Sequence, residues 1–154
     1  PAQDVPEIPE WIFNVPTELL QQLESAESAM RAGNALLAQT QFQALAESSV
    51  KDLQAIAKLE LASLNSATSM EQLRGVAAQF PEASTPGGLA VADIALLRAI
   101  AVSQSEADME KLIPDVLSRA CFHPSWLSER IFGTLEQHVK TSGVLLEDRV
   151  VSAH

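Results

Sequence analysis

The chain has 154 residues, of which 47% are hydrophobic and 5% aromatic, and it carries 20 acidic against 10 basic residues. This length suits a single domain with its own core. The net charge of −10, without a cluster of Lys or Arg, excludes nucleic acid and anionic membrane surfaces as preferred partners. Ala (23 residues) and Leu (20 residues) dominate the apolar content and favour helices over strands, so we expect an all-α protein.

Residues 1–16 contain four of the eight prolines and are predicted to form an extended acidic arm. Within this arm, Trp11, Ile12 and Phe13 form an apolar cluster. Its exposure to water is unfavourable, at about 25 cal/mol per Å². We expect the cluster to pack over the first helical hairpin. The alternative is a partner-binding motif, through which the chain binds another protein or self-associates.

Residues 17–142 are predicted to form one helical domain, with about seven helices, followed by a tail at residues 143–154. Thr17 is the expected N-cap of the first helix. Gly33 ends that helix and Asn34 caps the second, which runs to about residue 48.

Two Ser/Thr-x-x-acid patterns predict capping boxes for the next two helices, Ser49 with Asp52 and Thr68 with Glu71. The fourth helix is expected to stop at Pro81. Residues 81–88 are rich in breakers and predict a long loop between a front and a back half.

The fifth predicted helix, residues 89–103, is apolar nearly all round, which indicates the centre of the fold. Asp93 and Arg98 are its charged exceptions. Because charges on a covered helix are costly unless paired, we favour interhelical ion pairs. The alternative is a groove that binds a partner, in which the planar guanidinium of Arg98 would hold a partner carboxylate.

Ser105 and Asp108 are expected to cap the sixth helix, and Pro114 predicts a kink or a restart after Ile113. Pro124 is expected to begin the seventh helix, which Gly143 closes.

Turn signals at residues 33, 65 and 103 are 32 and 38 residues apart, a spacing typical of stacked helical hairpins. Residues 26–46, AESAMRAGNALLAQTQFQALA, resemble a tetratricopeptide repeat, with Ala26 on the first helix, Gly33 at the turn, and Ala38 and Phe42 on the second. The resemblance implies antiparallel hairpins stacked in a short right-handed superhelix. A closed helical bundle uses the same apolar stripes and stays open as an alternative.

Later segments, among them LQAIAKLELASL, MEQLRGVAAQF and HPSWLSERIFGTL, resemble divergent bacterial tetratricopeptide-like domains. These domains are usually attached to the inner membrane and are ancillary partners of the translocon. The resemblance implies a bacterial cytoplasmic or periplasmic location, and we expect a soluble domain. Because the chain opens with Pro1 and not Met, we expect that an upstream segment has been removed.

Few residues suggest chemistry. Cys121 and His123 lack the surroundings of a nucleophile and its base, so Cys121 is predicted to be a buried structural thiol. His123 and His138 lack further ligands for a metal. Glu24 and Glu27 lie on a polar face where nothing is expected to raise a carboxyl pKa. We therefore predict no catalytic, cofactor or metal site, and no enzyme.

The expected function is a non-catalytic scaffold or adaptor that binds another protein or peptide through a helical groove or an end face. Partner-binding candidates are Trp11, Ile12, Phe13, Asp93 and Arg98. The alternative is a structural subunit that self-associates in a larger assembly through the arm.

Overall fold

The computed structural model describes residues 8–65, 69–122 and 126–142. Within these residues the chain is all-α, as predicted, and contains seven α-helices and one 3-10 helix. In chain order the elements are η2 (Glu10–Asn14), α1 (Thr17–Arg31), α2 (Ala35–Ala46), α3 (Lys51–Leu64), α4 (Ser69–Gln79), α5 (Val91–Val102), α6 (Glu106–Phe122) and α7 (Trp126–Ser142).

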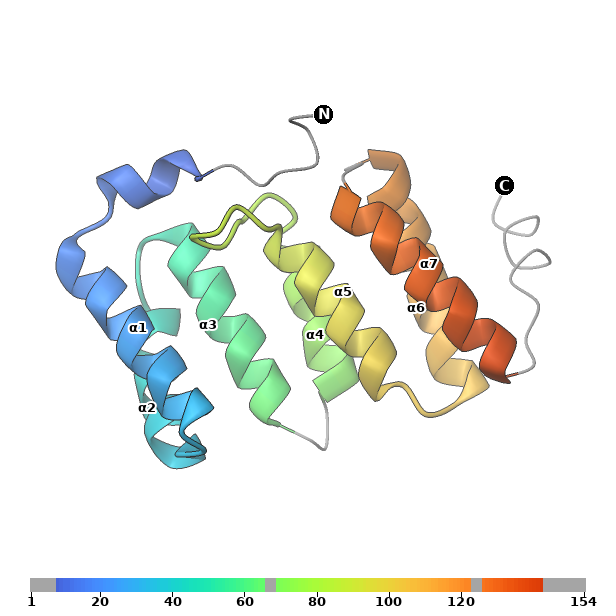
Figure 1. Cartoon of the computed structure of the whole chain (residues 1–154), viewed down its shortest axis with the longest axis horizontal. Coiled ribbons are helices and arrows are strands. Elements are labelled where there is room, and N and C mark those ends of the chain that lie inside the picture. The colour runs from blue at the N-terminus through green and yellow to red at the C-terminus, as the bar shows by residue number, and fades with distance from the viewer. Residues whose placement is uncertain (1–7, 66–68, 123–125, 143–154) are drawn as a thin grey trace.

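Successive helices run antiparallel and pack as neighbours, which confirms the predicted hairpins (Figure 1). In the view of Figure 1, α1, α3, α5 and α7 lie in front of α2, α4 and α6, so the helices form two layers. The C-terminal ends of α2, α4 and α6 lie at the same edge of the molecule, at the top of Figure 1. Helix η2 and the α4–α5 loop lie at this edge too. No helix among the described segments has both the length and the apolar content needed to cross a bilayer.

The first hairpin forms as its sequence predicts. Gly33 adopts φ +80° at the turn, a value that side chains disfavour. The Asn34 side chain then caps α2 by accepting a hydrogen bond from the backbone N–H of Leu37 at 3.2 Å. Ala26 on α1 and Ala38 on α2 are fully buried, as is Phe42. Small residues at this contact let the two helices approach closely.

Two cap predictions are wrong. Thr17 is the first residue of α1 and makes no cap, because the N-cap position belongs to Pro16. At the start of α3 the N-cap is Val50, without a side-chain cap bond. Asp52 does not close a box with Ser49, because its Oδ1 accepts a hydrogen bond from the Ser84 backbone N–H at 2.9 Å. A contact in the folded protein has replaced a local one.

The centre of the fold is α5, as predicted, because it contacts α3, α4, α6 and α7. Asp93 on this helix is only 1% exposed, and its Oδ1 accepts a hydrogen bond from Arg119 Nε of α6 at 2.8 Å. Arg119 also donates from Nη1 to the carbonyl of Pro81 at 2.9 Å, just after α4 ends. One buried guanidinium therefore joins α5, α6 and the end of α4.

Helix α6 is continuous through Pro114, so it does not restart after Ile113. Leu112, Ile113 and Val116 are buried on both sides of the proline and hold the helix against its neighbours. Cys121 is exposed and not buried as predicted. It follows the buried Arg119 by two residues, a rotation of roughly 200° about the helix axis, so it faces away from the core. Asp108 accepts from Gln104 N, and Ser105 Oγ accepts from Asp108 N, as the predicted cap requires.

Several predictions lie outside the described residues or side chains. They concern Thr68, His123, Pro124, His138, Gly143 and the tail at residues 143–154.

Candidate binding site

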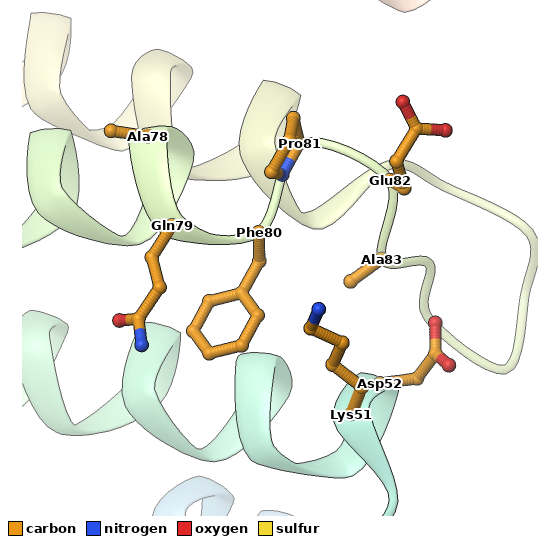
Figure 2. Close-up of a pocket in the computed structure, with 8 residues that line it drawn as sticks. All are labelled: Lys51, Asp52, Ala78, Gln79, Phe80, Pro81, Glu82 and Ala83. Atoms are coloured by element: carbon orange, nitrogen blue, oxygen red, sulfur yellow. The ribbon is translucent and has the colours of Figure 1, made fainter.

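A pocket of about 400 Å³ opens between the beginning of α3 and the end of α4 (Figure 2). Pro81 cannot continue the α4 hydrogen-bond ladder, so the chain leaves the helix here and turns into the α4–α5 loop. The pocket lies at this turn. The residues that line it are Lys51, Asp52, Ala78, Gln79, Phe80, Pro81, Glu82 and Ala83.

The walls of the pocket are largely apolar. The Phe80 ring, 2% exposed, points from the end of α4 toward α3 and forms the inner side. Lys58 lies about two helical turns beyond Lys51 on α3. Its Nζ is 5.4 Å from the centroid of this ring. Small residues, Ala78, Pro81 and Ala83, form the α4 and loop side. The result is a recess with room for a side chain.

The charged residues of the pocket point in different directions. In Figure 2 the Lys51 side chain extends from α3 toward the space between Phe80 and Ala83. The Glu82 carboxylate points away from that space, and Asp52 turns toward the loop, where it accepts from Ser84 N. In the part of the chain that the structure describes, Lys51 makes no hydrogen bond or ion pair. Of the three charged residues that line the pocket, Lys51 is the one that points toward the recess in Figure 2.

The N-terminal arm reaches the rim of this pocket. Trp11 Nε1 donates to the Ser84 carbonyl at 3.1 Å and to Ser84 Oγ at 3.2 Å, across 73 positions of sequence. Since Ser84 N in turn donates to Asp52, a continuous set of hydrogen bonds joins the arm, the loop and α3. Residues Glu10–Asn14 of the arm form η2 and are not extended as expected. Of the apolar cluster expected over the first hairpin, Trp11 is bonded to the α4–α5 loop.

Replacing Trp11 with Phe should loosen the arm while the rest of the domain stays folded. The substitution keeps an aromatic ring but removes the indole N–H and its two acceptors on Ser84. A hydrogen bond of this kind contributes about 0.5–1.5 kcal/mol net, so exchange of the Ile12 amide should be roughly threefold to tenfold faster. Hydrogen exchange followed by NMR measures this directly. Unchanged exchange at Ile12 would show that Trp11 does not hold the arm.

The other partner-binding candidates are spread over the molecule. Ile12 is half-buried, whereas Phe13 is 74% exposed. Asp93 is enclosed in its ion pair and presents no surface to a partner. Arg98 Nη1 donates to Glu60 Oε1 at 2.8 Å and to Ser63 Oγ at 2.9 Å, so it joins α5 to α3. The predicted ion pairing of both charged residues is confirmed, each with a partner on another helix.

Glu60 also acts on a carboxyl group of α1. Partial burial of the Glu27 carboxyl, together with repulsion from Glu60, raises its pKa above the usual 4.5, while Arg31 acts in the opposite direction. The expectation that nothing near Glu27 raises a carboxyl pKa is therefore wrong. The sequence could not reveal this, because α3 brings Glu60 close only in the folded chain.

Glu27→Gln should stabilise the protein slightly at pH 7 and not at pH 4. A raised pKa means that the folded protein binds the proton more tightly than the unfolded chain. Ionisation therefore costs the folded state stability as the pH rises above 4.5. Glu27 is on the surface, so the gain at pH 7 should be below about 0.5 kcal/mol. Urea unfolding at both pH values measures it, and an equal gain at pH 4 would contradict this explanation.

Two smaller recesses also adjoin α4. One of about 320 Å³ lies against α3 near Gly75, and one of about 250 Å³ lies against α6. The charges of the latter are already paired, because Arg74 Nε contacts Asp115 at 2.8 Å and Arg119 contacts Asp93. The 400 Å³ pocket is therefore the better candidate for a ligand. No cluster of His, Cys, Asp and Glu able to hold a metal ion occurs among the residues described.

Sequence reasoning identified Trp11 but missed Lys51 and Ser84 as site residues. Asp52 was noticed only as a cap. The contact between Asp52 and Ser84 joins residues 32 positions apart, so no local sequence pattern predicts it. The one usable signal was Phe80-Pro81, an aromatic residue at a forced helix end. Comparison with protein-family models, curated proteins and solved structures gave no match for this chain.

Proposed function

We propose that this domain is a non-catalytic scaffold or adaptor that binds another polypeptide at the end of the helical stack shown in Figure 2. The observation that carries the proposal is the pocket at the α3–α4 end. Its volume of about 400 Å³ falls within the roughly 300–1,000 Å³ typical of ligand sites. It combines largely apolar walls with three charged residues, Lys51, Asp52 and Glu82, of which Lys51 points toward the recess in Figure 2.

The stacking of the hairpins supports the same proposal. Residues 26–46 resemble a tetratricopeptide repeat, and Ala26, Ala38 and Phe42 are buried at the positions that this repeat uses for packing. In this proposal the hairpins form a short right-handed superhelix of the tetratricopeptide type. Such stacks present extended faces and ends to other polypeptides. The end face at α3 and α4 is the part of the stack that offers a recess.

A peptide-display selection tests the proposal. The intact domain should enrich peptides from a library, and Ala83→Leu should lose them, because the Ala83 methyl points into the recess in Figure 2 and a larger side chain there fills it. Circular dichroism checks that the variant folds. Gln43→Leu on the exposed face of α2 is the matched control. Enriched peptides that bind a folded Ala83→Leu variant as well as the parent would place binding elsewhere and contradict the proposal.

A second candidate function is self-association through the arm. It is favoured by Phe13 and Ile8, which are 74% and 66% exposed next to the fastened Trp11. If the arm joins copies of the chain, Phe13→Ser should lower the average mass found by light scattering. Leu36→Ser is the matched control, because Leu36 is equally exposed, at 76%, but lies on α2. A parent protein that is monomeric at high concentration would exclude this function.

A further inference from the structure

We infer that the pocket at the α3–α4 end receives the C-terminal residue of a polypeptide, with its apolar side chain in the recess and its free carboxylate on Lys51. This inference rests on the proposed function and specifies the kind of segment that binds. It makes Lys51 a specificity residue that distinguishes a chain end from an internal segment.

The first argument concerns charge. An ammonium group has three donors and no acceptor, and a carboxylate is its natural partner. Of the two carboxylates on the pocket wall, Asp52 is held by Ser84 N and Glu82 points away in Figure 2. Lys51 therefore approaches the recess without a carboxylate partner among the described residues. A ligand carboxylate would provide Lys51 with that partner.

The net charge of the chain does not contradict this. A charge of −10 opposes acidic ligands at long range, but salt at physiological strength screens exposed charges beyond about 8 Å. At the pocket, Asp52 accepts from Ser84 N and Glu82 points away, so Lys51 is the charged group that faces a ligand in the recess. A ligand with one negative charge at its end satisfies Lys51 while adding little repulsion. A strongly acidic segment would be repelled by the rest of the surface.

The second argument concerns shape and polarity. Ala78, Pro81 and Ala83 leave room because they are small, and the Phe80 ring closes the inner side. The recess is largely apolar, and the buried Phe80 ring bounds its inner side. A C-terminal residue supplies an apolar side chain and a carboxylate within one residue. An internal Asp or Glu would have to place its charge on Lys51 and leave the recess unfilled.

The test uses two small probes that differ only in the terminal group, N-acetyl-L-leucine and N-acetyl-L-leucinamide. Each is titrated into the full chain, and the backbone amide signals of residues 51–54 and 78–84 are followed by NMR. We expect the acid to bind at these residues about fivefold to tenfold more tightly than the amide, as a charge-assisted hydrogen bond predicts. Lys51→Met should abolish this difference. Lys51 is exposed, so the variant should fold, which circular dichroism checks.

Lys111→Met is the matched control, because Lys111 is an exposed lysine on α6 paired with Glu71, away from the pocket. It should keep the preference for the acid. Decanoate is a third probe that carries a carboxylate without a peptide group. Tighter binding of decanoate than of N-acetyl-L-leucine would identify a site for amphiphilic acids and overturn the polypeptide assignment.

The outcomes separate this inference from the proposed function. If acid and amide bind the pocket equally, or if Lys51→Met keeps the preference, the C-terminal inference is wrong while polypeptide binding at the pocket stands. If neither probe shifts residues 51–54 and 78–84, the inference is also overturned. The proposed function then fails only if selected peptides also bind the parent and Ala83→Leu alike.

Discussion

Asp93→Ala should lower the free energy of unfolding by about 3–5 kcal/mol, because it leaves the Arg119 guanidinium buried without its counter-charge. Asp93 is 1% exposed and Arg119 is 8% exposed, so water does not compensate for the loss. Arg119 also holds the carbonyl of Pro81 at the end of α4. The substitution therefore weakens the contact of α5 with both α6 and the turn that forms the candidate site. Urea unfolding followed by circular dichroism measures the loss.

A double variant separates the charge from the packing. Asp93→Leu with Arg119→Met removes both charges and keeps apolar volume, and buried ion pairs replaced in this way often lose little stability. We expect most of the loss seen in Asp93→Ala to be recovered. Arg98→Met is the control for a surface pair, because its side chain is 39% exposed and its bond to Glu60 should contribute about 1 kcal/mol or less. A loss below about 1 kcal/mol in Asp93→Ala would contradict the buried-pair explanation.

Phe42→Ala should also cost about 3–5 kcal/mol, the usual range for truncating a buried aromatic side chain. Phe42 is fully buried on α2, and α2 packs against both α1 and α3. The cavity would therefore lie where the first hairpin meets the next one. Thermal and urea unfolding measure the effect. The loss of stability in this variant tests whether each hairpin needs the next one to bury its apolar residues.

The matched control is Leu36→Ala on the same helix. Leu36 is 76% exposed, so its truncation should change stability by less than about 0.5 kcal/mol. A similar effect of both substitutions would mean that α2 contributes through helix propensity alone. A small effect of Phe42→Ala would contradict the role of this residue as the packing contact between hairpins.

Helix positions were the most predictable part of this protein, because each helix has an apolar stripe that must face a neighbour. Gly33 and Asn34 marked the first turn correctly, since a positive φ and a side-chain cap are local requirements. The burial of Ala38 and Phe42 also followed from helical spacing. The central position of α5 could be predicted because a helix that is apolar nearly all round needs cover on several sides.

The errors arose where a distant residue replaced a local partner. Asp52 binds the α4–α5 loop and so does not cap its own helix with Ser49. The sequence predicted that Asp93 pairs with another helix but not that its partner is Arg119, because the rotation of α6 decides which cation faces α5. Cys121 is exposed for the same reason. Sequence spacing gives the stripe of a helix, but only the packed structure gives its register against the next helix.

The candidate site could be predicted only in part. Trp11 was recognised as an apolar residue that needs cover, but its acceptor on Ser84 lies 73 positions away. Lys51 resembles any other surface lysine in the sequence. Lys51 lines the pocket because α4 ends at Pro81 beside the beginning of α3. That arrangement depends on how α3 and α4 pack against each other. Because the pocket is formed by the ends of two helices, its residues do not form a continuous sequence motif.

The most direct measurement is a set of intermolecular nuclear Overhauser effects between a peptide selected by the domain and protein methyl groups. Polypeptide binding at the α3–α4 end predicts contacts from the peptide to the methyl groups of Ala78 and Ala83, which line the pocket. It also predicts that the contacts to Ala83 come from the last residue of the peptide. Contacts confined to Leu36 and Leu37 on the exposed side of α2, with none to Ala78 or Ala83, would contradict it.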